Sequence, residues 1–143
     1  MRIASQTFHT CATAALLFLL PAADATGQIR YDRGQNVAPV YEGWIQNADG
    51  TFTMVFGYMN RNWEEGLDIP VGPDNRIEPG GPDYGQPTYF YPRRNRFVFR
   101  VPVPDGFEVD DEMVWTLTVN GVTDQAFATL LSLIHISEPT RPY

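Results

Sequence analysis

The segment from residue 26 to residue 130 contains no serine, cysteine, histidine or lysine, and every basic residue in it is an arginine. It therefore holds no Ser–His–Asp or Cys–His arrangement and no lysine for Schiff-base chemistry. It also lacks the nitrogen and sulfur ligands that zinc, copper and haem usually take. It forms no disulfide, so its core alone must hold it together. These absences predict a protein that is not an enzyme.

The whole chain has 143 residues, with 10 basic and 17 acidic side chains and a net charge of −7. With 43% hydrophobic and 13% aromatic residues, it has enough apolar surface for the core of one small domain. Nucleic acids and anionic membranes need clustered cations on their partners, so the acidity argues against both. Proteins and glycans remain as partner classes.

Residues 1–25 have the pattern of a secretory signal peptide. Arg2 supplies the positive charge, Cys11–Leu20 is a short apolar run, and Ala23-Asp24-Ala25 offers small residues at the cleavage site. The run is too short to cross a bilayer, which takes about 20 residues. The alternative is a buried N-terminal helix. We predict export to the periplasm or the extracellular space, with no transmembrane segment in the mature chain.

The end of the chain has a different character. Leu131–Arg141 reads LSLIHISEPTR, which resembles the translation of a transposon-end sequencing adapter. The alternative is a natural apolar strand with a polar tail. We interpret residues 131–143 as an artefactual tail, which is excluded from fold reasoning. On this interpretation residues 26–130 are the domain, and the chain is a C-terminally truncated fragment of a longer protein.

Alternating apolar residues predict strands in the first half of the domain and in its middle. Val40–Gln46 and Thr51–Met59 flank the turn Asn47–Gly50, which predicts a β-hairpin. Phe97–Val103 places Phe97, Phe99, Val101 and Val103 on one face, and Pro102 predicts an edge strand or a strand end. A short strand is also expected at Tyr89–Tyr91.

The clearest strand is Met113–Val119, whose alternation places Met113, Trp115, Leu117 and Val119 inward and the residues between them outward. Asn120-Gly121 after it is typical of a type I′ turn, and Val122–Leu130 is expected to return beside it. This hairpin places Trp115 opposite Ala126, where the small alanine makes room for the indole. Strands at this spacing with Gly/Pro turns predict an all-β, antiparallel β-sandwich, of which the immunoglobulin-like fold is one form.

Residues 61–87 are rich in proline, glycine and acid, and we predict one long loop there. Carboxylates on glycine-rich backbone are suitable ligands for calcium, although the spacing matches no EF-hand. The candidate ligands are Asp68, Asp74, Glu78 and Asp83. The alternative is a solvated acidic surface without calcium. No other cofactor is expected.

Four aromatic residues lie in or beside this loop, namely Trp63, Tyr84, Tyr89 and Tyr91. Exposed rings of this kind stack on sugars, with neighbouring polar groups bonding the hydroxyls. The alternative, which we favour, is that they turn inward and fix the loop to the sheet. A glycosidase would need two suitably spaced carboxylates, and the nominal candidates are better explained as surface charge.

The basic residues cluster at Arg93, Arg94, Arg96 and Arg100. Such a cluster can bind a carboxylate or a phosphate through paired hydrogen bonds. Because acid is in excess in this chain, we expect instead that the cluster neutralises the acidic loop at residues 61–87.

The stretch from YEGWIQNADGTFTMVFGYMNRNWEE to PRRNRFVFRVPVP resembles a group of uncharacterised exported bacterial proteins over most of residues 30–130. The resemblance implies export and a chain that continues beyond this end, and it supplies no catalytic residue. We predict an exported, non-enzymatic β-sandwich that serves as an interaction or accessory module of a longer protein. The alternative is a secreted carbohydrate-binding module or a carboxylate-based glycoside-active protein.

Overall fold

The computed structural model describes residues 29–131, which form β-strands and, within that range, no helix. The predicted signal segment (1–25) and the predicted tail from residue 132 onward lie outside the described residues. The strands are β1 (Val37–Gln46), β2 (Phe52–Asn60), β3 (Leu67–Asp68), β4 (Asn75–Glu78), β5 (Tyr89–Phe90), β6 (Arg93–Pro102), β7 (Met113–Val119) and β8 (Val122–Ala128).

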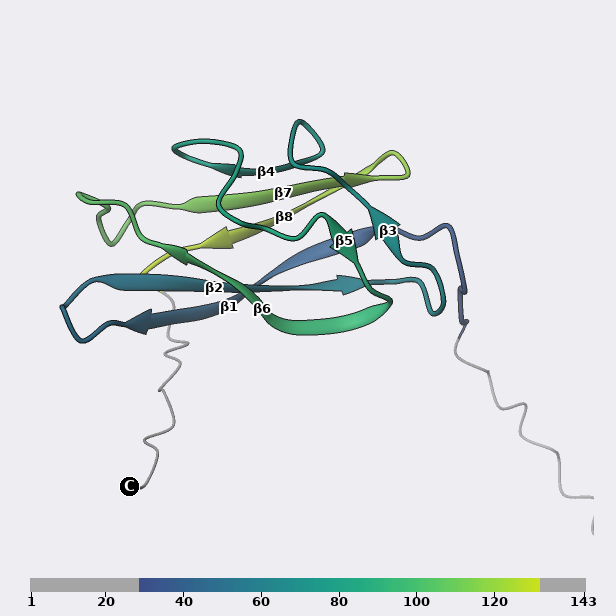
Figure 1. Cartoon of the computed structure of the whole chain (residues 1–143), viewed down its shortest axis with the longest axis horizontal. Helices are drawn as coiled ribbons and strands as arrows, with labels where there is room; N and C mark the ends of the chain where they lie inside the picture. Colours follow the sequence, from purple (N-terminus) through teal and green to yellow (C-terminus); the bar gives the residue numbers. More distant parts are fainter. Residues whose placement is uncertain (1–28, 132–143) are drawn as a thin grey trace, which may run out of the picture.

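The strands form two antiparallel three-stranded sheets that face each other (Figure 1). One sheet has the order β1-β2-β6 and the other has the order β4-β7-β8, while β3 and β5 form a small separate pair. The prediction of an antiparallel β-sandwich is confirmed. Within residues 29–131 no helix is long and apolar enough to cross a membrane.

Both predicted hairpins are present. β1 and β2 are joined at residues 47–50, where the Asp49 carboxylate accepts hydrogen bonds from the Thr51 N–H and hydroxyl. These bonds lower the pKa of Asp49. The β7–β8 turn has φ 52° at Asn120 and 76° at Gly121, as a type I′ turn requires. Trp115 lies opposite Ala126, in the predicted register.

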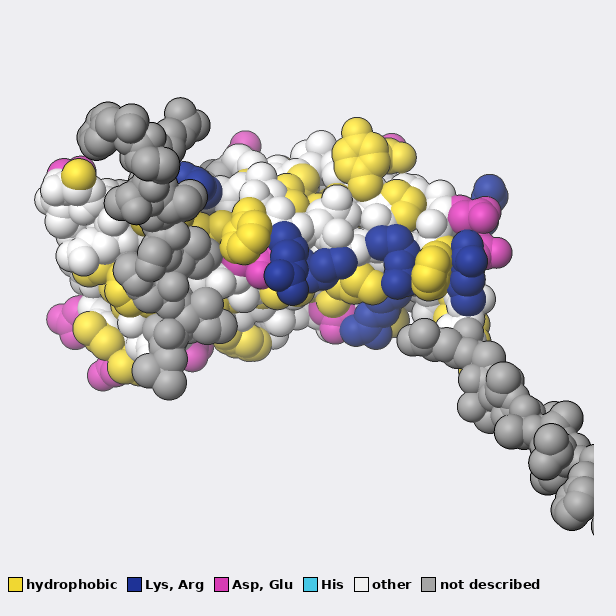
Figure 2. All heavy atoms as spheres, turned by 90° about the horizontal axis from the view of Figure 1, so that it is seen from below, with side chains coloured by type: hydrophobic (Ala, Val, Ile, Leu, Met, Phe, Trp, Pro, Cys, Tyr) yellow, Lys and Arg dark blue, Asp and Glu magenta, His cyan; other side chains and the backbone are white. Residues whose placement is uncertain are grey.

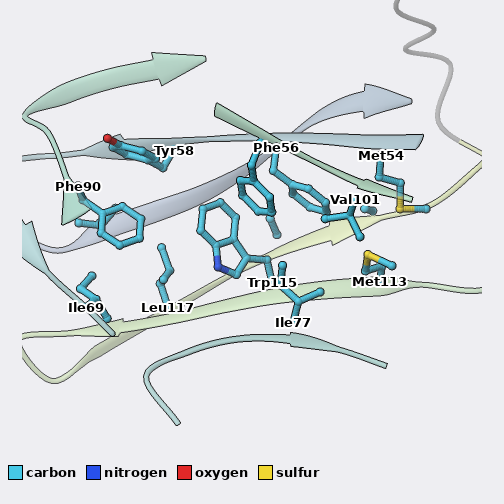
Figure 3. Close-up of a cluster of buried hydrophobic side chains, with 14 of the residues drawn as sticks. Met54, Phe56, Tyr58, Ile69, Ile77, Phe90, Val101, Met113, Trp115 and Leu117 are labelled. Carbon is cyan, nitrogen blue, oxygen red and sulfur yellow. The ribbon is translucent and has the colours of Figure 1, made fainter. Parts of the chain in front are cut away.

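Trp115 lies at the centre of the core between the two sheets (Figure 3). Its ring meets Phe99 edge-on at 4.9 Å and Phe56 at 5.9 Å, both from the opposite sheet. Its indole N–H donates to the Asn75 side-chain oxygen at 3.0 Å. The fully buried Asn75 amide also donates to the carbonyls of Ile69 and Pro87, each at 2.9 Å. One buried polar side chain thus joins the indole to the connecting segment around β4.

The segment at residues 61–87 is not one continuous loop, because it contains β3 and β4. β4 pairs with the whole middle of β7, with Asn75 opposite Leu117 and Ile77 opposite Trp115. Asn75 and Ile77 are fully buried, whereas their neighbours Arg76 and Glu78 are not. The alternation covers only four residues, and prolines stand close to both of its ends. A pattern this short is not recognised as a strand, so the composition of the segment predicts a loop.

β6 begins earlier than predicted and is interrupted in its middle. Phe56 pairs with Phe99, but Tyr58 pairs with Asn95, so three β6 residues lie opposite the single residue Gly57. This irregularity turns Phe97 to solvent with a φ of 53°, and the prediction that Phe97 shares the inner face is wrong. Phe99 and Val101 do face the core, and β6 is an edge strand that ends at Pro102.

Candidate binding surface

Trp63 lies three residues after the end of β2, and its backbone N–H donates a 3.0 Å hydrogen bond to the Tyr31 carbonyl. The guanidinium carbons of Arg30 and Arg93 lie over its ring, 4.1 and 3.7 Å from the centre. Two guanidinium groups this close to one ring centre would overlap on a single face, so the indole is held between them. The faces on which a sugar would stack are therefore covered by arginine.

The three predicted tyrosines do not act as one group. Tyr84 donates its hydroxyl hydrogen bond to the Pro79 carbonyl at 2.5 Å and packs against the core, as the inward alternative predicts. Tyr89 and Tyr91 are 44% and 64% exposed, and their rings meet edge-on at 4.9 Å and 76°. Rings at that angle do not form one flat platform for a sugar.

The four candidate calcium ligands do not come together. Asp68 and Asp74 line one shallow cavity of about 330 Å³. Glu78 pairs with Arg76 at 3.5 Å, and Asp83 accepts a hydrogen bond from the Gly85 N–H at 2.9 Å. Among residues 29–131, no three Asp, Glu, His or Cys side chains are grouped so that they could hold a metal ion.

Arg94 has a structural partner. Its guanidinium pairs with the Glu42 carboxylate and donates to the carbonyls of Tyr58 and Asn95, at 3.1 and 2.9 Å. Glu42 is the extra residue of a bulge in β1, so the ion pair reaches from β1 over the middle strand β2 to β6. It passes over Gly57, which has no side chain to block it.

The other arginines of the cluster are not paired in this way. In the described part of the chain, no carboxylate lies within 4.0 Å of Arg93, Arg96 or Arg100. The expectation that the cluster neutralises the acidic segment at 61–87 is wrong. The physical reason lies in the topology. β4 places residues 75–78 of that segment in the opposite sheet, and Trp63, at the start of the same segment, meets Arg93 through its ring and not through a carboxylate.

Arginine side chains and exposed rings form what we call the arginine-aromatic face. Its residues are Arg30, Trp63, Arg93, Arg96, Phe97 and Arg100. Of its arginines, Arg30 pairs with Asp32 at 3.5 Å. The face lies on the side of the β1-β2-β6 sheet, where Figure 2 shows arginine side chains in a row with hydrophobic side chains among them.

Two hollows mark this face. One, of about 360 Å³, is lined by Trp63, Arg93 and Met59 among others. The second, of about 250 Å³, is lined by Ile45, Val55, Phe97 and Arg100.

The backbone of β6 is strained at two positions on this face. Arg93 has a φ of 71° and Phe97 has a φ of 53°, a region that bulky side chains rarely adopt. Each such residue costs on the order of 1 kcal/mol, and strained residues concentrate at functional sites. Phe97 is also 54% exposed, so its strain is not offset by burial of the ring.

Comparisons with protein families, with known proteins and with solved structures found no match to this chain. The immunoglobulin-like form of the sandwich and the resemblance to exported bacterial proteins therefore stay predictions. Sequence reasoning named Trp63 and the arginines separately. It missed Arg30 and the exposure of Phe97, because the first is distant in sequence and the second depends on a bulge.

Proposed function

We propose that this chain is an exported, non-enzymatic interaction module that binds an acidic protein segment through the arginine-aromatic face. The observation that carries the proposal is the set of three guanidinium groups, those of Arg93, Arg96 and Arg100. Within residues 29–131 they have no carboxylate within 4.0 Å, although acid is in excess in the chain. Export is supported by the signal-like pattern at 1–25.

The chemistry of arginine favours a partner with carboxylates. Its planar guanidinium donates paired hydrogen bonds to a carboxylate or phosphate group, and these bonds are stronger than neutral ones. Arg96 and Arg100 are exposed, and Arg93 is held in place over Trp63. Arginines that are held in place lose less side-chain freedom on binding, so more of the interaction free energy is available for the partner.

The apolar hollow favours a peptide over a glycan. Ile45, Val55 and Phe97 offer no hydrogen-bonding side-chain group, so sugar hydroxyls placed there would lose their water without a replacement. An aliphatic or aromatic side chain would instead be buried favourably. The face thus suits a segment in which an apolar residue is flanked by glutamate or aspartate.

The test uses calorimetric titration with a synthetic peptide that contains phenylalanine flanked by glutamates. The same peptide with glutamine in place of glutamate is the control ligand, and polygalacturonate is the glycan ligand. We expect the acidic peptide to bind, and the double variant Arg96→Gln/Arg100→Gln to bind it at least about tenfold more weakly. Arg76→Gln is the matched control, because Arg76 lies on β4 in the other sheet and should leave binding unchanged.

Two results would contradict the proposal. Binding of neither ligand would remove the evidence for a recognition surface. Binding of polygalacturonate that is lost on Tyr89→Ala or Tyr91→Ala, and kept in the arginine double variant, would establish the carbohydrate-binding alternative instead.

A further inference from the structure

The two hollows of the arginine-aromatic face lie along one strand. Phe56 and Tyr58 of β2 belong to the core, so Val55, Gly57 and Met59 point to the outer side of the β1-β2-β6 sheet. Val55 lines the hollow of about 250 Å³, and Met59 lines the hollow of about 360 Å³. Four residues of a strand span about 13 Å, so the two hollows are separated by about that distance along β2.

The stretch between the two hollows is covered by the ion pair of Glu42 and Arg94. The pair lies over Gly57, and its side chains are only 10% and 30% exposed. β2 is the middle strand of its sheet and pairs with β1 on one side and with β6 on the other. A partner on this face is therefore held by side chains that enter the hollows, and it does not join the sheet as a further strand.

The smaller hollow suits an apolar side chain. Ile45 and Val55, which line it, are buried, and Phe97 beside them is 54% exposed. An apolar side chain placed there removes part of the Phe97 ring from water, which is favourable in proportion to the area covered.

The larger hollow suits an anion. Arg30, Arg61 and Arg93 line it, and within residues 29–131 no carboxylate does so. Arg30 and Arg61 each have an acidic neighbour, at 3.5 and 4.0 Å, but no described carboxylate lies within 4.0 Å of Arg93. The Arg93 guanidinium is held 3.7 Å from the centre of the Trp63 ring. Arg93 is therefore the group in this hollow that a carboxylate of the partner can bind.

We propose that the partner is an extended acidic segment in which an apolar residue and a carboxylate stand four positions apart. This inference rests on the proposed function and specifies the segment that the face selects. Side chains alternate along an extended chain, so residues four apart point the same way and lie about 13 Å apart, which matches the separation of the hollows. The apolar side chain enters the smaller hollow, and the carboxylate pairs with Arg93.

The spacing excludes a helical partner with the same two residues. Four residues of a helix rise only about 6 Å, so a helix would need about nine residues to reach from one hollow to the other. Like charges along an acidic segment also repel one another and keep the segment extended.

The test compares peptides of identical composition by calorimetric titration into the full chain. Each peptide contains phenylalanine flanked by glutamates, and a further glutamate stands three, four or eight positions from the phenylalanine, on its N-terminal or its C-terminal side. Because an extended peptide lies on the face in one direction, we expect one of the two four-position peptides to bind about tenfold more tightly than any other.

Two variants locate this preference. Arg93→Gln should reduce it to less than about twofold, and Arg93→Lys, which keeps the charge, should retain part of it. Arg100→Gln is the matched control, because Arg100 lines the smaller hollow. It should weaken all the peptides by a similar factor and leave the preference unchanged.

The outcomes separate this inference from the proposed function. Equal affinities for all positions, tightest binding of an eight-position peptide, or a preference that persists in Arg93→Gln would overturn the extended register. In each of these cases the acidic peptide still binds, so the proposed function stands. Binding of none of the peptides would overturn both.

Discussion

Gly57→Ala tests the bridge that Glu42 and Arg94 form over the middle strand. An added Cβ would lie 2.5 Å from the Asn95 carbonyl oxygen and 3.0 Å from an Arg94 nitrogen, and it would collide with the Glu42 carboxylate. The carbonyl belongs to the backbone of β6 and has little freedom to move away. The backbone of β6 would have to shift, whereas Glu42 and Arg94 meet the added Cβ only with the ends of their side chains.

The expected magnitude follows from two opposing effects. Overpacking of this kind costs about 1–3 kcal/mol. Replacing glycine by alanine on an unstrained backbone gains about 0.4–1 kcal/mol, because the unfolded chain loses freedom. We expect a net loss of about 1 kcal/mol in the free energy of unfolding, which lowers Tm by about 6 °C in a domain of this size.

Thermal and urea unfolding followed by circular dichroism measure this loss. The sign of the change is decisive, since an unobstructed glycine would give a higher Tm on substitution by alanine. The double variant Glu42→Ala/Gly57→Ala is the control, because trimming Glu42 removes one of the three contacts. The cost of Gly57→Ala should then fall by more than about 0.5 kcal/mol. An unchanged or raised Tm in the single variant would refute the reasoning.

Two further predictions concern buried polar groups. Asn75→Ala leaves the Trp115 indole N–H and two carbonyls without partners in the core, so we expect the free energy of unfolding in urea to fall by about 3 kcal/mol. Asn47→Ala, in the exposed hairpin, is the control and should cost clearly less. Equal costs would contradict the central role of Asn75. Burial raises the pKa of Tyr41 from 10.0 to about 12, so its contribution to stability is present below pH 10 and is lost as the pH rises toward 12. Tyr41→Phe should lose less stability than the parent over that interval, and parallel losses would show that Tyr41 does not titrate in this way.

The parts of the fold that follow from local pattern could be predicted from the sequence. The β7–β8 hairpin is one example, because Asn120-Gly121 fixes the turn and the alternation from Met113 to Val119 fixes the inner face. A turn of known geometry sets the register of the strands on either side. The opposition of Trp115 and Ala126 then follows without further information.

The parts that depend on contacts between distant segments could not be predicted. β4 is stabilised by pairing with β7, about 40 residues away, and its four residues carry too weak a pattern to be recognised. The same holds for the candidate surface. Charge balance alone suggested that the arginines of β6 would meet the acidic segment, but strand order places that segment's β4 on the other sheet. Trp63 is covered by Arg30 and Arg93, which come from segments on either side of it in the chain.

We propose that the arginine-aromatic face is a recognition surface for carboxylates. The most direct measurement is a nuclear magnetic resonance titration of the labelled chain with the phenylalanine–glutamate peptide. We expect the largest shifts on the side chains of Arg93, Arg96 and Arg100 and on the Trp63 indole N–H. Shifts that gather instead at Tyr89 and Tyr91, or no shifts at any peptide concentration, would contradict the proposal.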